Sequence, residues 1–165
     1  QLGDEPVFRI GFERTRRFAL SRDLLGSGLE AELAPSAAAT LGTLETSAGA
    51  GAALRIGDGL EADFGPSTGL RAVPGAGFDG GSAASWDAFA ALGGLAVARN
   101  ALLDGTLFRD SRSVDRNPLV GFLTLGASAS LGPATLGYAH SFRSREFGGQ
   151  EGWTSYGSMR LSVRF

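Results

Sequence analysis

The chain has 165 residues, with 15 Lys and Arg against 17 Asp and Glu, and a formal net charge of −2. Its hydrophobic content of 43% is too high for a disordered chain, and its length suits a single domain. Only 19% of the residues are charged, below the roughly 25% that is usual for a soluble domain. The balanced charge and the lack of a basic stripe interleaved with aromatics argue against a nucleic-acid partner.

A membrane protein built on helices is excluded, because no run of about 18 apolar residues occurs anywhere in the chain. The mean hydropathy of +0.05 instead fits barrel strands, whose alternating lipid-facing and lumen-facing side chains average out. The absence of cysteine excludes disulfides and thiolate metal sites. Composition alone therefore leaves a β-barrel as the membrane-bound option.

Alternation of apolar and polar residues, bounded by Gly, Pro, Asp or Asn, predicts about seven strands. We expect them at 7–18, 29–41, 46–56, 86–99, 119–131, 134–145 and 156–165. The fourth is apolar on both faces, so its orientation is ambiguous. Our prediction for its lipid-facing side is Phe89, Ala91, Leu95 and Val97.

The last predicted strand alternates Met159 and Leu161 with Arg160 and Arg164, and it closes on the aromatic Phe165. A terminal aromatic of this kind resembles the signal by which the barrel assembly machinery recognises outer-membrane barrels for insertion. An ordinary amphipathic edge strand is the alternative explanation. The terminal Phe and the two inward arginines favour an all-β fold, a transmembrane antiparallel β-barrel.

Charged residues gather on the polar faces of the predicted strands, where a lumen can pair them into ion networks. They are Arg9, Glu13, Glu30, Glu32, Arg55, Arg143, Arg145, Arg160 and Arg164. A soluble β-sandwich is the competing fold, but it would need more charges on its outer faces. Bacterial single-chain barrels have even strand numbers, so we expect residues 1–165 to be one N-terminally truncated barrel domain.

The predicted strand directions also give a topology. With the C-terminus in the periplasm, segments 101–117 and 146–154 lie outside the cell. Segment 57–85, which is rich in Gly and Pro, becomes a long periplasmic loop. Such a long loop on that side is unusual, since periplasmic turns of barrels are short.

Two motifs could carry nucleophilic or acid–base chemistry, and each has a more ordinary explanation. Residues 65–69 match the pattern of a serine nucleophile elbow around Ser67, but that motif needs a strand before the serine and a helix after it. His140 is the sole imidazole and stands between Tyr138 and Phe142 on an apolar face. We predict a loop for the first and an aromatic interface girdle for the second.

Two groups of acids resemble oxygen ligands for a hard cation, which binds several carboxylates at once. They are Asp58, Glu61 and Asp63, and Asp104, Asp110 and Asp115. Neither group has the spacing of an EF-hand, so solvated loop acids are the expected reading. Asp104 and Gly105 are typical of a turn.

Three stretches and the opening QLGDEP (1–6) together resemble the lipid A deacylase family of Gram-negative outer membranes. The stretches are LRIGDGLEADFGP (54–66), LLDGTLFRDSRSVDRNPLVG (102–121), and SREFGGQ (144–150) followed by YGSMRLSVRF (156–165). The likeness covers nearly the whole chain. Two departures concern loop geometry: Thr43 stands where the family commonly has Asn, and Leu102 where an aromatic is usual.

The resemblance implies a barrel of roughly a dozen strands in the outer membrane. Such a barrel would hydrolyse an ester-linked acyl chain of the lipid A of lipopolysaccharide, with calcium as cofactor. The family's catalytic residues would lie upstream of Gln1, so none is transferred to a position here, and this chain alone is expected to be inactive. The alternative is a non-catalytic porin or translocator barrel surrounded by outer-membrane lipids.

Overall fold

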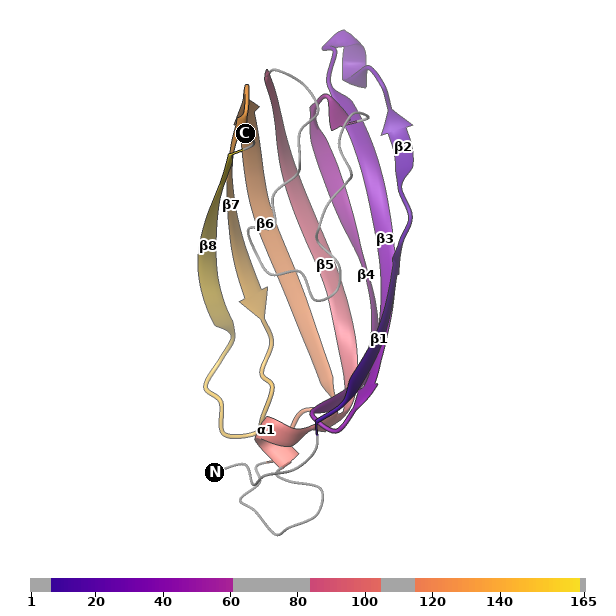
Figure 1. The fold of residues 1–165 in the computed structure, drawn as a ribbon, viewed down its shortest axis with the longest axis vertical. Helices are drawn as coiled ribbons and strands as arrows, with labels where there is room; N and C mark the ends of the chain where they lie inside the picture. Colours follow the sequence, from indigo (N-terminus) through magenta and orange to yellow (C-terminus); the bar gives the residue numbers. More distant parts are fainter. Residues whose placement is uncertain (1–6, 61–83, 105–114, 164–165) are drawn as a thin grey trace.

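The computed structural model describes residues 7–60, 84–104 and 115–163, and these form a single antiparallel sheet that curves into a wall (Figure 1). The strand order is β1-β3-β4-β5-β6-β7-β8, with β2 also paired to β3. The strands are β1 (Arg9–Thr15), β2 (Phe18–Ser21), β3 (Glu30–Gly42), β4 (Glu45–Asp58), β5 (Ala84–Asn100), β6 (Leu119–Leu131), β7 (Ala134–Arg143) and β8 (Thr154–Val163). A 3-10 turn, η1 (Leu24–Gly26), and a short helix, α1 (Ala101–Asp104), complete the described elements. Neither these nor any other described helical segment is long and apolar enough to cross a membrane.

The all-β prediction is confirmed, and every predicted strand has a counterpart. The first prediction, 7–18, is divided into β1 and β2, which lie beside β3 in one unbroken register from Thr15 opposite Ser36 to Phe18 opposite Leu33. Arg16 lies between them, and its N–H donates to the carbonyl of Pro35 at 3.0 Å. Proline has no N–H to return to Arg16, so the ladder loses one bond there and the strand is interrupted.

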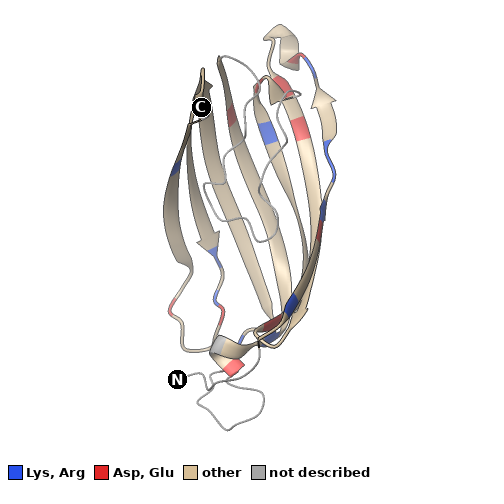
Figure 2. Cartoon of the chain, in the orientation of Figure 1, with Lys and Arg blue, Asp and Glu red and all other residues tan. Residues whose placement is uncertain are grey.

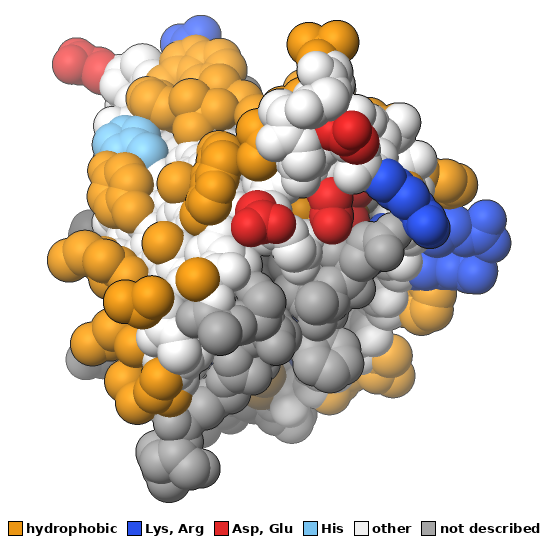
Figure 3. Space-filling view, turned by 90° about the horizontal axis from the view of Figure 1, so that it is seen from above, with side chains coloured by type: hydrophobic (Ala, Val, Ile, Leu, Met, Phe, Trp, Pro, Cys, Tyr) orange, Lys and Arg blue, Asp and Glu red, His pale blue; other side chains and the backbone are white. Residues whose placement is uncertain are grey.

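The two faces of the wall differ sharply in character. On β3, Glu32, Ala34 and Ala38 are buried on the inner face, while Ala39 and Leu41 are exposed on the outer face. Large apolar side chains project from the outer face of every described strand. They include Ile10 (71% exposed), Leu92 (65%), Leu125, Leu131 (76%), Leu136 and Met159. Some of these side chains are seen at the rim of the molecule in the view from above (Figure 3). An outer apolar surface of this extent suits lipid, as the alternation predicts.

The predicted orientation of β5 is wrong. Phe89, Ala91, Leu95 and Val97 lie on the inner face, where Ala91 and Leu95 are buried, and the outer face of the strand carries Leu92 instead. The physical reason is Asp87, which shares the parity of Phe89 and needs polar partners that only the inner face provides. Because alternate residues share a face, this one carboxylate fixes the facing of the whole strand.

Glycines on the inner face make room for aromatic rings from the neighbouring strand. The ring of Phe89 lies over Gly126, where an added Cβ would be 2.5 Å from the ring. The ring of Phe122 lies over Gly93 in the same way. Phe89 packs against the buried cluster Ala34, Ala53 and Ala91, so the inner surface is filled by large and small residues in alternation.

The ends of the wall agree with the predicted loop placement. The β6–β7 turn is tight, with Gly132 at φ 58°, a left-handed conformation that glycine adopts without strain. At the opposite end, Asn117 N–H donates to Glu146 O at 2.8 Å, which brings the segments after β5 and after β7 together. The chain leaves β4 after Asp58 and re-enters β5 at Ala84, at the end that holds the tight turn. Residues 61–83, and Phe165 with its proposed signal, lie outside the described residues, so those predictions stay open.

Candidate functional site on the inner face of the wall

An ionic network runs across the inner face from the β1–β2 junction to β6. Its members, which we call the inner-wall network, are Arg17, Glu32, Arg55, Asp87 and Ser128. Acidic and basic residues stand close together on neighbouring strands in the upper half of the wall (Figure 2). Each residue comes from a different segment, so the network connects the β1–β2 junction with β3, β4, β5 and β6.

The register of the sheet creates these contacts. Glu32 and Arg55 are direct cross-strand partners, and Asp87 and Ser128 are another such pair. Arg55 Nη1 lies 2.5 Å from Glu32 Oε1, and Arg55 Nε lies 3.6 Å from Asp87 Oδ2. The hydroxyl of Ser128 donates to Asp87 Oδ1. Directly opposite and diagonal positions on one face are the distances at which long side chains meet.

Arg17 closes the network at the edge of the sheet. Its Nη2 lies 2.6 Å from Glu32 Oε2, and the same nitrogen donates to the carbonyl of Leu60 at 2.6 Å. Glu32 therefore accepts from two guanidinium groups, one through each carboxylate oxygen. Charge-assisted bonds of this kind are about twice as strong as neutral ones.

The network is closed to solvent except at the edge of the sheet, where the side chain of Arg17 is 31% exposed. Arg55 is 0% exposed, Glu32 5% and Asp87 4%. Its two arginines and two carboxylates cancel in formal charge, which is the condition under which burial of ions is tolerated. Removing one member would leave an unpaired buried charge, whereas the intact set contributes little net stability over an apolar core.

Hydroxyl pairs continue this polar face around the wall. The hydroxyls of Ser130 and Thr135 lie 2.9 Å apart, and those of Thr124 and Ser141 lie 2.8 Å apart. Both pairs are cross-strand contacts between β6 and β7. These pairs extend the polar part of the inner face as far as β7.

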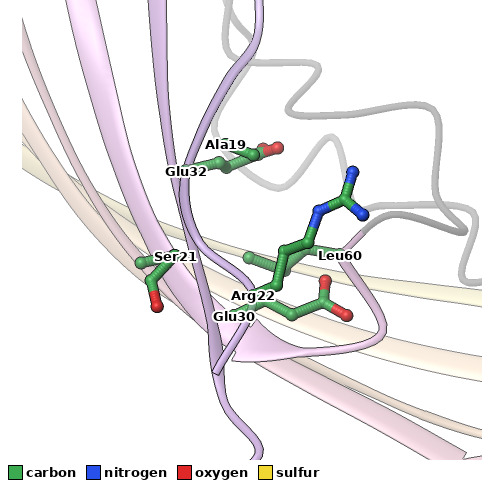
Figure 4. Close-up of a pocket in the computed structure, with 7 residues that line it drawn as sticks. Ala19, Ser21, Arg22, Glu30, Glu32 and Leu60 are labelled. Carbon is green, nitrogen blue, oxygen red and sulfur yellow. The ribbon is translucent and has the colours of Figure 1, made fainter. Parts of the chain in front are cut away.

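A small cavity adjoins the network at Glu32, lined also by Arg22, Glu30 and Leu60 (Figure 4). Arg22 and Glu30 extend to the same side of the ribbon, towards Leu60. The cavity volume of about 20 Å³ has room for roughly one water molecule. It is too small to hold a substrate.

A larger cavity of about 360 Å³ lies on the inner face at the opposite end of the wall. Leu95, Val97, Leu103 and Val120 give it apolar sides. Its polar residues are Glu45, Asn100, Arg116, Asn117, Arg143 and Glu146. Arg116 Nη1 lies 2.8 Å from Asp104 Oδ1, and Arg143 Nη1 lies 2.7 Å from Glu146 Oε1. The volume suits a small ligand, but the acids and bases that line it are balanced in charge.

His140 lies where the sequence predicts it, on the outer face of β7. Tyr138 Oη and His140 Nδ1 are 3.2 Å apart, and the rings of His140 and Phe142 have centroids 4.7 Å apart. The side chains around it in the described structure are aromatic and apolar, without a carboxylate. An aromatic column of this kind suits a membrane interface.

The two predicted acid groups are not brought together by the parts of the chain that are described. Asp58 and Asp115 are exposed, while Asp104 accepts from Asn100 N–H at 2.8 Å and pairs with Arg116. Glu61, Asp63 and Asp110 lie outside the described residues, as does Ser67 with the elbow-like motif. Across residues 7–60, 84–104 and 115–163, no three His, Cys, Asp or Glu side chains are grouped as metal ligands.

The predicted ion networks of the lumen are confirmed in part. Glu32 pairs with Arg55, and Arg143 pairs with Glu146. Arg9 and Glu13 are exposed instead, and Arg164 lies outside the described residues. The sequence analysis missed Arg17 and Asp87. Asp87 could have been found from its charge, since a strand facing lipid on the side of Phe89 would have put this carboxylate into the membrane.

A curved antiparallel wall that is apolar outside and ionic inside defines an outer-membrane β-barrel class of protein. The family model described as "Outer membrane protein LpxR" matches residues 1–165, so the chain belongs to the LpxR family of outer-membrane proteins. Among solved structures, LpxR from Salmonella typhimurium is similar, with a TM-score of 0.72 at 21% sequence identity. That match covers 96% of this chain and 52% of the other, so the chain spans about half the length of that structure. No curated protein matches.

Proposed function

We propose that the protein acts as a lipid A deacylase, a carboxylic ester hydrolase that removes an ester-linked acyl chain of lipopolysaccharide lipid A. The observation that carries the proposal is the family match over residues 1–165. Motif stretches at 54–66, 102–121 and 144–150, which resemble the deacylases, support it. The outer apolar face supports it too, because a lipid substrate approaches such a wall from the membrane.

In this proposal the described residues form the wall and the catalytic groups lie elsewhere. Ester hydrolysis needs a base that can reach a water molecule or a hydroxyl. His140, the single imidazole, faces lipid beside Tyr138 and Phe142, without a carboxylate to orient it. We therefore propose that the base is upstream of Gln1 and that residues 1–165 alone are inactive.

Calcium is the proposed cofactor of the whole protein, but the described acids do not fit a calcium site. Glu32 and Asp87 stand on either side of Arg55, and each is held by an arginine or a serine. Hard cations need several oxygens converging on one point. We therefore derive no step through calcium from these residues.

A non-catalytic pore is the second candidate, and one observation favours it. The inner-wall network lies on the face that would line a lumen, as charged constrictions of porins do. A pore would conduct ions across a planar bilayer, whereas a deacylase with a filled interior would not. Conductance therefore separates the two candidates.

The test is to express the full-length protein in the outer membrane of a host with fully acylated lipid A. Mass spectrometry of the extracted lipid A should then show loss of one acyl chain. His140→Ala should deacylate at the wild-type rate, because that side chain contacts Tyr138 and Phe142 and has no carboxylate beside it to orient it as a base. Unchanged lipid A together with bilayer conductance would refute the deacylase in favour of the pore.

A further inference from the structure

The larger cavity of the inner face lies where α1 follows β5, at the end of the wall opposite the tight β6–β7 turn (Figure 1). The predicted topology places this end outside the cell. The polar residues of the cavity stand at the ends of β4, β5, β6 and β7 and in the segments beside them. These four strands are neighbours in the middle of the sheet, so the cavity does not depend on what pairs at either edge.

Hydrogen bonds within the chain fix two of the polar residues that line the cavity. The side-chain amide of Asn117 donates to Arg145 O at 2.8 Å, which ties the segment before β6 to the segment after β7. Arg116 Nε donates to Val97 O at 3.2 Å, which ties the same segment to β5. The polar groups are therefore positioned before a ligand arrives, and such preorganisation lowers the entropic cost of binding.

The formal charges of the lining residues cancel, because Arg116 and Arg143 are matched by Glu45 and Glu146. Each guanidinium also stands beside a carboxylate, Arg116 beside Asp104 and Arg143 beside Glu146. A charged ligand would meet charges of both signs at similar distances and gain little net attraction. The cavity therefore suits a neutral ligand.

The ion pairs leave hydrogen-bonding capacity of both kinds unused. Among the described residues, Arg116 Nη2 and Arg143 Nη2 have no acceptor. In the same part of the chain, Glu146 Oε2 and Asn117 Oδ1 have no donor. One hydroxyl group donates one hydrogen bond and accepts two, so a ligand rich in hydroxyls can satisfy both kinds of group.

We propose that this cavity binds a neutral pyranose sugar of lipopolysaccharide. A pyranose carries hydroxyls around its edge and C–H groups on its faces, so it matches polar groups set around apolar sides. The apolar sides of the cavity are Leu95, Val97, Leu103 and Val120. Its volume of about 360 Å³ falls in the range of roughly 300–1,000 Å³ that is usual for small-ligand sites.

The location of the cavity favours lipopolysaccharide as the source of the sugar. Its saccharide begins at the outer surface of the membrane, beside the strand ends that line the cavity. Between β3 and β4 the rim is a turn of two residues, Thr43 and Leu44, over which a saccharide can reach the inner face. This second contact rests on the proposed function, in which the wall already holds the lipid part of the same molecule. Such tethering raises the effective concentration of the sugar to about the millimolar range.

The test measures binding of the full-length protein to three lipids in detergent by native mass spectrometry. The probes are lipopolysaccharide that carries neutral hexoses, lipopolysaccharide that ends before these hexoses, and lipid A without sugars. Calcium is chelated, and lipids with and without the labile acyl chain are counted together, so the result does not depend on deacylation.

The main variant is R143M/E146M, which removes a half-exposed ion pair together with its unused donors and acceptors and leaves the net charge unchanged. An exposed pair of this kind contributes little to stability, so the variant should fold. R9M/E13M is the matched control, because it removes the same two charges from exposed inward positions on β1, outside the cavity. L103W changes no charge and adds volume on the apolar side of the cavity.

We expect the wild type and R9M/E13M to bind the lipopolysaccharide with neutral hexoses about tenfold more tightly than the one without them. R143M/E146M and L103W should each reduce this preference to within about twofold, with the binding of lipid A unchanged. Heat-modifiable gel mobility shows that each variant folds.

A wild type that binds the two lipopolysaccharides equally would overturn the sugar site. So would a preference that survives in both R143M/E146M and L103W, or a loss of binding in these variants that is equal for all three lipids. Acyl release in calcium without any preference for neutral hexoses would refute the sugar site alone. A preference for neutral hexoses without acyl release in calcium would refute the deacylase alone.

Discussion

Glu32 and Arg55 face each other directly on β3 and β4, and their side chains meet at 2.5 Å with Arg55 fully shielded from solvent. Glu32→Gln would leave the Arg55 charge buried with a weaker set of partners. We expect the free energy of unfolding in lipid vesicles, measured by urea titration, to fall by about 3–5 kcal/mol. Glu13→Gln is the control: this inward carboxylate is exposed, so its loss should stay within about 0.5 kcal/mol. Equal effects of the two substitutions would show that the pair is not buried on the inner face of the folded protein.

The corrected orientation of β5 can be checked with two adjacent alanines. Ala91 is buried on the inner face and Ala90 is exposed on the outer face. Because the chain has no cysteine, Ala90→Cys and Ala91→Cys each provide a single site for a nitroxide label. Oxygen dissolved in the bilayer should increase the spin relaxation rate of the nitroxide at position 90 much more than that of the nitroxide at position 91. The reverse order would restore the original prediction that Ala91 faces lipid.

Gly57 lies opposite Asp87, and an added Cβ would come within 2.8 Å of the Cα of Asp87 and closer still to the carbonyl of Trp86. Gly57→Ala should therefore force β4 and β5 apart and lower stability by about 1–3 kcal/mol. Gly137→Ala is a matched control, since that buried glycine has its nearest neighbour at 3.7 Å, an ordinary contact. Heat-modifiable gel mobility measures whether each of the two variants folds, and urea titration measures its free energy of unfolding. Similar stability of the two variants would mean that the strands approach less closely than described.

Single cysteines also test which end of the wall faces the cell exterior. Gly149 and Pro133 are both exposed, at opposite ends of the sheet. A membrane-impermeant maleimide should label Gly149→Cys on intact cells and leave Pro133→Cys unlabelled until the outer membrane is opened. Ser67→Cys, in the predicted periplasmic loop, should behave as Pro133→Cys does. Surface labelling of both Pro133→Cys and Ser67→Cys would invert the topology.

The strands were predictable because their apolar and polar residues alternate, and alternation reports facing wherever one face carries charge. On β3 and β4, Glu32 and Arg55 mark the inner face, and the predicted facing is confirmed. On β5 the apolar residues on both faces obscured the signal, although Asp87 alone was sufficient to settle it. The position of Asp87 predicts the observed facing of β5, because a charged side chain in lipid costs more free energy than an alanine in a lumen.

The site itself was less predictable than the fold. Arg17 shares the parity of Arg9 and Glu13 in the predicted strand 7–18, so alternation does place it on the inner face, but alternation does not give its partner Glu32. The partners of Asp87 depend on register between β4, β5 and β6, and register comes from pairing across 61–83 and 105–114. Sequence periodicity gives facing within one strand, but it does not say which residue of the next strand stands opposite.

Arg16 and Arg17 are adjacent in the chain, yet one faces outward and the other joins the inner-wall network. A shift of the strand by a single residue would reverse both facings, so that Arg17 would point outward and Arg16 inward. The same slip in β3 to β5 would turn Glu32, Arg55 and Asp87 toward hydrocarbon, at up to about 2–4 kcal/mol for the arginine and less for each acid. The buried ions therefore select the strand alignment: they penalise every slip by one residue, even where they add little to the stability of the correct alignment.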